Sequence, residues 1–214
     1  TDADTDLHGI YATYNGLEDH SIDGYVLYQR TGQPGTDNDN LFTVGARATG
    51  VYGQFDYEAE VAVQSGDYIN IAPTPDVDTD YEGTAINVEV GYTFDSNMQP
   101  RVFLGAAQFS GADKADEAGF QRMYSDWEYS EFLGDGDMSN VLILRAGVSA
   151  NATEKIGVSA VISTFELDEE LAAAGNYNNV TAISANDDDL GTEIGLYATY
   201  QYSEDVALEV GAAQ

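Results

Sequence analysis

The sequence predicts an all-β protein, a transmembrane antiparallel up-and-down β-barrel of which this chain supplies about ten strands. Three observations lead to this prediction. Segments of alternating hydropathy recur along the chain, and the connections between them are by turns short and long. No run of residues approaches the ~20 apolar residues of a membrane-spanning helix, whereas alternating segments of ~9–11 residues are long enough to cross a bilayer obliquely.

Period-2 alternation marks each strand in order along the chain. In Phe55–Gln64, for example, apolar side chains oppose Asp56, Glu58 and Glu60. The same alternation marks the other predicted strands, which are Leu7–Tyr14, Ile22–Tyr28, Leu41–Tyr52, Thr84–Phe94, Arg101–Phe109, Asn140–Ser149, Ile156–Phe165, Leu190–Tyr202 and Val206–Ala213. A charge that points into lipid costs a few kcal/mol, so the polar face of each strand is predicted to point inward.

The connections between the predicted strands orient the chain. Those after the odd-numbered strands are short, and those after the even-numbered strands are long: Thr31–Asn40, Ser65–Gly83, Ser110–Ser139 and Glu166–Asp189. This alternation is typical of outer-membrane barrels, which have short periplasmic turns and long external loops. Both ends of the segment 1–214 would then lie outside, so we expect a single barrel segment that is incomplete at both ends, because open sheet edges are not viable in lipid.

Composition excludes several classes of function. With 7 Lys and Arg against 38 Asp and Glu, the net charge is -31, and such a surface repels nucleic acid. The chain has no cysteine, which excludes disulfides and thiolate metal sites. Hydrophobic residues make up 43% of the chain and aromatic residues 11%, which argues against disorder despite the charge.

Charged residues on the polar faces are the candidate lumen lining. They are Arg47, Arg101, Arg145, Asp56, Glu58, Glu60 and Glu89. Such side chains either line a water-filled lumen, where rings of charge select ions, or pair with one another to stiffen the wall. Most other acidic residues fall in the long connections. They are either simply solvated or attract cations toward a pore mouth.

The longest connection, Ser110–Ser139, is also the most aromatic. Its aromatic residues include Phe120, Tyr124, Trp127 and Tyr129. We expect it either to fold back and constrict or plug a lumen, or to form an external cap.

Motifs for catalysis or metal binding are absent or weak. The small polar residues form no nucleophile elbow or zinc pattern, so the chain is not expected to be an enzyme or to hold a cofactor. Asp76, Asp78 and Asp80 are weak candidates for external calcium binding. The pattern departs from a calcium-binding EF-hand loop, because Tyr81 takes the place of its glycine and Asn87 that of its final glutamate.

The strand-by-strand pattern resembles the alginate export family of outer-membrane barrels. The resemblance covers most of the chain, and the segments that show it are Asp6–Tyr14, Gly16–His20, Asp23–Tyr28, Leu41–Arg47, Phe55–Glu60, Gln64–Asp67 and Val88–Phe94. It implies a large monomeric barrel in the cell outer membrane that conducts a solute passively. The alginate exporter has an arginine-rich lumen for a polyanion, whereas this chain has few basic residues and rows of acidic ones.

We therefore predict a porin-like channel for small hydrophilic solutes or ions, with the lipid bilayer and lipopolysaccharide as its surroundings. No nucleic-acid partner is expected. One alternative is a structural barrel that sheathes or scaffolds another envelope component. Another is a secreted acidic β-sandwich with calcium-dependent adhesion.

Overall fold

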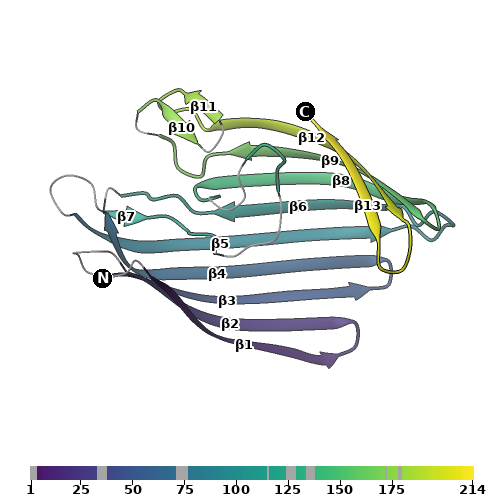
Figure 1. Cartoon of the computed structure of the whole chain (residues 1–214), viewed down its shortest axis with the longest axis horizontal. Coiled ribbons are helices and arrows are strands. Elements are labelled where there is room, and N and C mark those ends of the chain that lie inside the picture. The colour runs from purple at the N-terminus through teal and green to yellow at the C-terminus, as the bar shows by residue number, and fades with distance from the viewer. Residues whose placement is uncertain are drawn as a thin grey trace.

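The computed structural model describes residues 4–32, 38–70, 77–114, 116–123, 129–133, 138–171, 173–177 and 180–214, and for residues 68–70, 77, 78 and 182 it describes the backbone only. Ten long strands form one antiparallel sheet in the order β1-β2-β3-β4-β5-β6-β8-β9-β12-β13 (Figure 1). Their bounds are β1 (Thr5–Leu17), β2 (His20–Thr31), β3 (Asp39–Tyr52), β4 (Phe55–Asn70), β5 (Val77–Thr93), β6 (Arg101–Phe109), β8 (Val141–Thr153), β9 (Ile156–Glu166), β12 (Asp189–Gln201) and β13 (Ala207–Ala213).

All ten predicted strands are present, so the all-β, up-and-down antiparallel prediction is confirmed. Each long strand pairs with the next long strand along the chain. Three short strands lie in the described parts of the long connections: β7 (Glu117–Ala118) pairs in parallel with β5, and β10 (Gly175–Tyr177) and β11 (Val180–Ile183) form a separate two-stranded sheet. The main strands form a single sheet, so the β-sandwich alternative is wrong. Among the described residues β1 and β13 each have one neighbour in the sheet, and the prediction of a longer barrel stays a prediction.

The described residues include no helix that is long and apolar enough to cross a membrane.

Tight turns connect the strands at one end of the sheet. The turn from β1 to β2 contains Asp19 with φ 59°, and the turn from β3 to β4 contains Gly53 with φ 64°. Aspartate and especially glycine tolerate this left-handed backbone, and a two-residue hairpin needs it. We call this end of the sheet the turn end and the opposite end the loop end.

The prediction of a long loop over Ser65–Gly83 is wrong. Strand β4 continues to Asn70 and β5 begins at Val77, and these two residues pair with each other. Asp78, Asp80 and Glu82 therefore lie in β5 and not in a loop. The extended hairpin is stabilised by β7, because the amide of Asp80 donates to the carbonyl oxygen of Asp116 at 2.9 Å.

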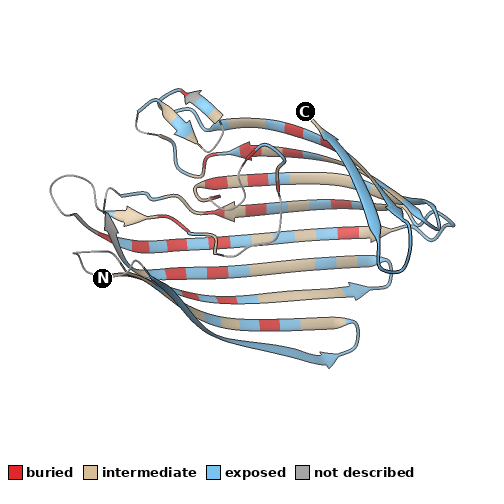
Figure 2. Ribbon diagram, viewed as in Figure 1, coloured by how far each residue is buried: buried red, intermediate tan, exposed pale blue. Residues whose placement is uncertain are grey.

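The two faces of the sheet differ in burial. The inner face carries the polar residues of β4 and their cross-strand neighbours, such as Arg47 opposite Glu60 and Thr43 opposite Gln64. The outer face carries the alternate residues. Buried residues gather on the loop-end half of the strands (Figure 2), where the described parts of the connection from β6 to β8 pack on the inner face.

Candidate functional site on the inner face of the sheet

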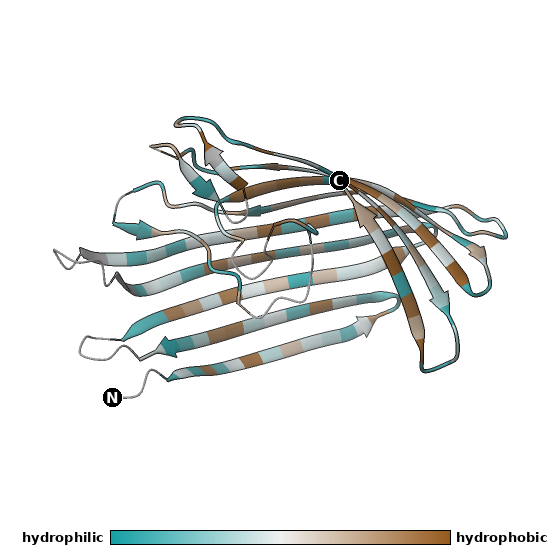
Figure 3. Cartoon of the chain, turned by 45° about the horizontal axis from the view of Figure 1, so that its top comes forward, coloured by the Kyte–Doolittle hydropathy of each residue, from teal (hydrophilic) through white to brown (hydrophobic). Residues whose placement is uncertain are grey.

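The outer face is apolar and exposed. Apolar residues alternate with more polar ones along the strands (Figure 3), as expected for one apolar face and one polar face. The exposed fraction reaches 76% for Ile10 and 70% for Leu104. We call the central part of this face the outer band, and it comprises Ile10, Val26, Val44, Val61, Val88, Leu104, Leu144, Ile162, Ile194, Leu196, Leu208 and Val210. In the described strands no Asp, Glu, Lys or Arg shares this band.

The inner face carries ion pairs toward the turn end. The Arg47 guanidinium on β3 donates to both carboxylate oxygens of Glu58 on β4, at 3.1 Å from Nε and 2.8 Å from Nη2. The Arg101 guanidinium on β6 donates from Nε to Asp56 Oδ2 at 2.9 Å and from Nη2 to Glu89 Oε1 at 2.9 Å. Charge-assisted and bidentate bonds of this kind fix the positions of both partners. The side chains remain 15–36% exposed, so water still reaches them.

Gly91 on β5 allows the side chain of Arg101 on β6 to reach Asp56 on β4. Asp56 on β4 lies opposite Gly91 on β5, and Gly91 in turn lies opposite Phe103 on β6. A Cβ atom on Gly91 would approach Arg101 Nε to 2.4 Å. The missing side chain therefore lets the guanidinium cross β5 and bind a carboxylate two strands away.

Two tyrosines extend the polar network toward β1. Tyr25 on β2 donates from its hydroxyl to Glu60 Oε1 at 2.6 Å, across Gly45 of the intervening strand. Its ring stacks on Tyr11 of β1, with centroids 5.9 Å apart and an interplanar angle of 2°. The sequence analysis missed both tyrosines, although each is out of phase with the apolar residues of its strand and therefore faces inward.

The connection from β6 to β8 crosses the inner face. At β4, the Gln64 side chain donates to the carbonyl oxygen of Gln121 at 2.9 Å and accepts the Gln121 amide at 2.7 Å. At β12, Glu193 accepts the Ser130 hydroxyl at 2.6 Å and the Glu131 amide at 3.1 Å. The two anchors are five steps apart in the strand order, so the described parts of this connection span most of the sheet.

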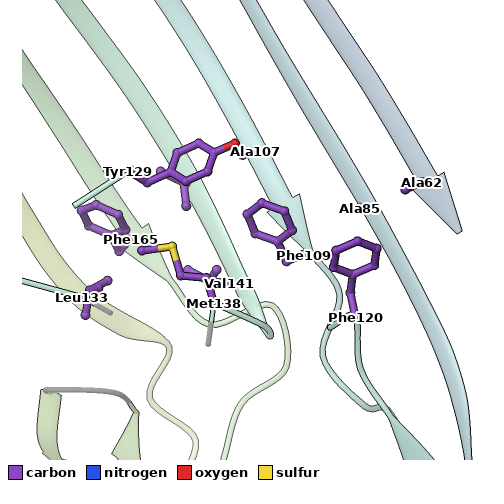
Figure 4. Close-up of a cluster of buried hydrophobic side chains, with 11 residues drawn as sticks. Ala62, Ala85, Ala107, Phe109, Phe120, Tyr129, Leu133, Met138, Val141 and Phe165 are labelled. Atoms are coloured by element: carbon purple, nitrogen blue, oxygen red, sulfur yellow. The ribbon is translucent and has the colours of Figure 1, made fainter. Parts of the chain in front are cut away.

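Aromatic and aliphatic side chains pack beneath this connection (Figure 4). Phe109 of β6 stacks on Phe120 at 5.8 Å and meets Tyr129 edge to face at 5.8 Å. Met138, Val141 and Ile143 are fully buried. Burial raises the pKa of the Tyr129 hydroxyl to about 12, because the charged phenolate would lose its hydration. We call these residues, together with Leu133 and Phe165, the loop core.

Two arginines pack against aromatic rings of the loop core. Arg145 of β8 lies over the rings of Phe103 and Tyr129, at 5.7 and 5.5 Å from the centroids. Its Nε is buried and has no hydrogen-bond partner within the part of the chain that the structure describes. Arg122 of the connection lies 5.1 Å from the rings of Phe109 and Tyr129. Cation–π contacts of this kind are stronger when the cation is shielded from water.

The sequence-predicted residues therefore separate into three groups. Six of the seven charged candidates, Arg47, Arg101, Asp56, Glu58, Glu60 and Glu89, form the polar network toward the turn end. Arg145 lies on the same face but against aromatic rings. Phe120 and Tyr129 are buried in the loop core, whereas Tyr124 and Trp127 lie outside the described residues.

The three candidate calcium ligands are not brought together among the residues that the structure describes. Asp76 lies outside the described residues, only the backbone of Asp78 is described, and Asp80 is exposed in β5. In the described parts of the chain no three His, Cys, Asp or Glu side chains are grouped so that they could hold a metal ion.

No curated protein matches the sequence. The family described as "Alginate export" matches residues 1–214, which is the whole chain, and this confirms the resemblance seen in the strand pattern. The chain therefore belongs to the alginate export family, a family of outer-membrane export channels.

Proposed function

We propose that this chain forms the wall of a porin-like channel through which small hydrophilic solutes or ions pass passively across the outer membrane. In this proposal the outer band faces lipid, with lipopolysaccharide in the external leaflet, and the inner face lines the lumen of a monomeric barrel. The polar network, including Arg47, Arg101 and Glu60, then borders the solute path.

One observation above all supports this proposal: the two faces of the same strands have opposite chemistry. The outer band is apolar and free of charge over the described strands, yet it is exposed. An isolated soluble protein rarely exposes so much contiguous apolar surface. The alternate residues are ion-paired and hydrogen-bonded. An arginine at the bilayer midplane costs ~2–4 kcal/mol, so lipid on one side and water on the other explains this division.

Aromatic residues at the turn end support the membrane placement. Phe55 and Tyr92 meet edge to face with centroids 4.9 Å apart, and Tyr92 meets Phe94 at the same separation. Tyr52 and Tyr202 are 80% and 65% exposed near the same end. Aromatic girdles of this kind mark the membrane–water interface of outer-membrane barrels, because the ring prefers hydrocarbon and the hydroxyl prefers water.

The loop core supports a constricted path rather than a wide pore. The connection that covers it is anchored on β4 and on β12, so a solute would have to pass beside it. The ion pairs of the polar network toward the turn end remain partly exposed. We therefore propose that the connection from β6 to β8 sets the size limit for passage.

Conductance measurements test the proposal. The full-length protein, reconstituted in planar bilayers in potassium chloride, should give single-channel currents. A variant in which residues 119–133 are replaced by a short Gly-Ser linker should conduct several-fold more. The folded state of each protein is checked by the heat-dependent gel mobility that barrels show. Absence of current from both proteins, although both are folded and inserted, would contradict the channel and favour a structural sheath.

A further inference from the structure

A groove of about 700 Å³ opens on the outer face of the sheet, over strands β4, β5, β6, β8, β9 and β12. The described residues that line it are aliphatic, aromatic or glycine, and none of them is charged. They include Phe55, Leu104, Ala146, Val148, Ala160 and Ile162. The groove lies in the outer band, which the proposed function places against lipid, so its occupant comes from the membrane and not from the lumen.

Small side chains form the floor of the groove, and larger side chains form its rims. The floor contains Ala146 on β8 and Ala160 on β9, and both residues are half-buried. In the strand register their neighbours are Leu104 and Ile162 beside Ala146, and Val148 and Leu196 beside Ala160. These four rim residues are 45–70% exposed. Ala160 lies nearer the turn end than Ala146, so the groove crosses the strands obliquely.

The width of the groove selects a single acyl chain. The rims lie on the two strands that flank one floor strand, so their backbones are about 10 Å apart and their side chains narrow the opening further. An α-helix is ~10–12 Å across and does not fit, whereas an acyl chain is a single file of CH₂ groups. Lipid tails are as apolar as the groove, so a chain that fills it gains only closer packing. A preference for one kind of lipid must therefore come from its headgroup.

A cation marks the turn end of the groove. Lys155 lies in the turn from β8 to β9, and it is the only lysine or arginine in the five turns at this end, all of which the structure describes. It is exposed and forms no salt bridge with a described residue. Ala160 follows it by five residues, or about 17 Å along the strand. At the ~35–45° strand tilt of outer-membrane barrels this is a depth of ~13 Å, within the ~15 Å of one leaflet.

Carboxylates surround Lys155 in the neighbouring turns. The Lys155 carbonyl oxygen accepts the Gln201 amide at 2.8 Å, which brings the turn from β12 to β13 alongside. The other charged residues in this turn, in the turn from β8 to β9 and in the turn from β5 to β6 are all acidic and exposed: Asp95, Glu154, Glu204 and Asp205. They repel a headgroup of net negative charge. A headgroup with both a phosphate and an ammonium can pair the phosphate with Lys155 and the ammonium with the carboxylates.

From this juxtaposition we infer that the groove and Lys155 together hold one phospholipid of the phosphatidylethanolamine class. One acyl chain fills the groove, the phosphate binds the Lys155 ammonium, and the primary ammonium of the lipid donates to the carboxylates of the adjacent turns. Phosphatidylcholine carries the same charges, but its quaternary ammonium has no N–H group to donate. The inference rests on the membrane placement in the proposed function, and it does not require the protein to conduct.

Native mass spectrometry of the full-length protein in detergent measures which lipids it retains. The probe is an equimolar mixture of phosphatidylethanolamine, phosphatidylglycerol and phosphatidylcholine with identical acyl chains. One molecule of phosphatidylethanolamine should be retained per protein, about fivefold more often than either competitor. Retention of none of the lipids, equal retention of all three, or a preference for either competitor would overturn the inference.

A filled groove tests where the acyl chain lies. The double variant Ala146→Leu, Ala160→Leu should abolish the retention of phosphatidylethanolamine, because the longer side chains occupy the floor of the groove. Both positions are on the outer face, so the packing of the inner face stays unchanged. The matched control is Ala59→Leu, since Ala59 lies on the outer face of β4 but outside the groove lining. Unchanged retention in the double variant would place the lipid elsewhere and overturn the inference.

A charge variant tests where the headgroup lies. Lys155→Gln should reduce the retention of phosphatidylethanolamine about fivefold, because the phosphate loses its cation. Lys114→Gln is the control, since Lys114 is exposed in the connection from β6 to β8. Equal retention in the two variants, both shown to be folded by their heat-dependent gel mobility, would overturn the inference. A folded protein that retains phosphatidylethanolamine but passes no current would instead contradict only the proposed channel.

Discussion

Toward the turn end, the inner face carries ion pairs whose side chains stay 15–36% exposed, whereas toward the loop end it carries aromatic and aliphatic side chains that are less than a tenth exposed. Ion pairs that water reaches contribute ~0–1 kcal/mol each. Truncation of a buried aromatic side chain costs ~3–5 kcal/mol. The comparison indicates that the loop end supplies most of the stability of this face, while the turn end keeps its charged side chains accessible to water.

The largest effect is expected in the loop core. Phe109→Ala should lower the free energy of unfolding by about 3–5 kcal/mol, because the ring contacts both Phe120 and Tyr129 and is only 6% exposed. Urea unfolding of the protein in lipid vesicles measures the change. The matched control is Phe42→Ala, since Phe42 is 42% exposed on the outer face. Equal losses in the two variants would show that the loop core adds no stability of its own.

A smaller effect is expected at the anchor of the connection on β12. Glu193→Ala removes the acceptor for the Ser130 hydroxyl and the Glu131 amide, and hydrogen bonds to charged groups contribute about 1.5–3 kcal/mol. Hydrogen exchange at the amides of residues 129–133 should therefore become faster, while exchange in β4 and β5 stays unchanged. Glu209→Ala on the neighbouring strand serves as the control. If exchange stays slow in Glu193→Ala, this carboxylate is not an anchor.

The smallest effect on stability is expected in the polar network. Arg101→Met separates Asp56 and Glu89 from their shared cation, yet the free energy of unfolding should fall by only about 1 kcal/mol, because water already reaches all three side chains. The difference from wild type should shrink further in high salt, which screens exposed pairs. A loss as large as that of Phe109→Ala, measured by the same urea unfolding, would remove the contrast between the two halves.

The strands could be predicted from the sequence because their signal is local. Period-2 alternation fixes which residues share a face, and it places Arg47, Glu58 and Glu89 on the polar faces of their strands. The same rule could have found the extension of β5. Val77, Thr79 and Tyr81 alternate with acidic residues, and Thr79 and Tyr81 are buried. Aspartate and glutamate are also common in solvated loops, so the sequence of this segment is compatible with either structure.

The arrangement of the site could not be predicted, because it depends on contacts between distant parts of the chain. No local pattern shows that Gln64 binds Gln121 or that Glu193 binds Ser130. The same holds for Arg145, which alternation places on the inner face but whose guanidinium lies over the rings of Phe103 and Tyr129. Only the glycines offered a hint, since Gly91 and Gly45 each leave room for a long side chain from the neighbouring strand.

The central claim is that water borders the inner face and lipid borders the outer face, and cysteine labelling on β4 tests it most directly. Residues 1–214 contain no cysteine, so each variant introduces one thiol into this segment at a chosen position. In the reconstituted full-length protein, Glu58→Cys should react with a membrane-impermeant thiol reagent, because that side chain is partly exposed on the inner face. Val61→Cys, in the outer band, should resist this reagent but be reached by a lipid-soluble quencher once labelled. Equal labelling of both positions by the water-soluble reagent would contradict the account.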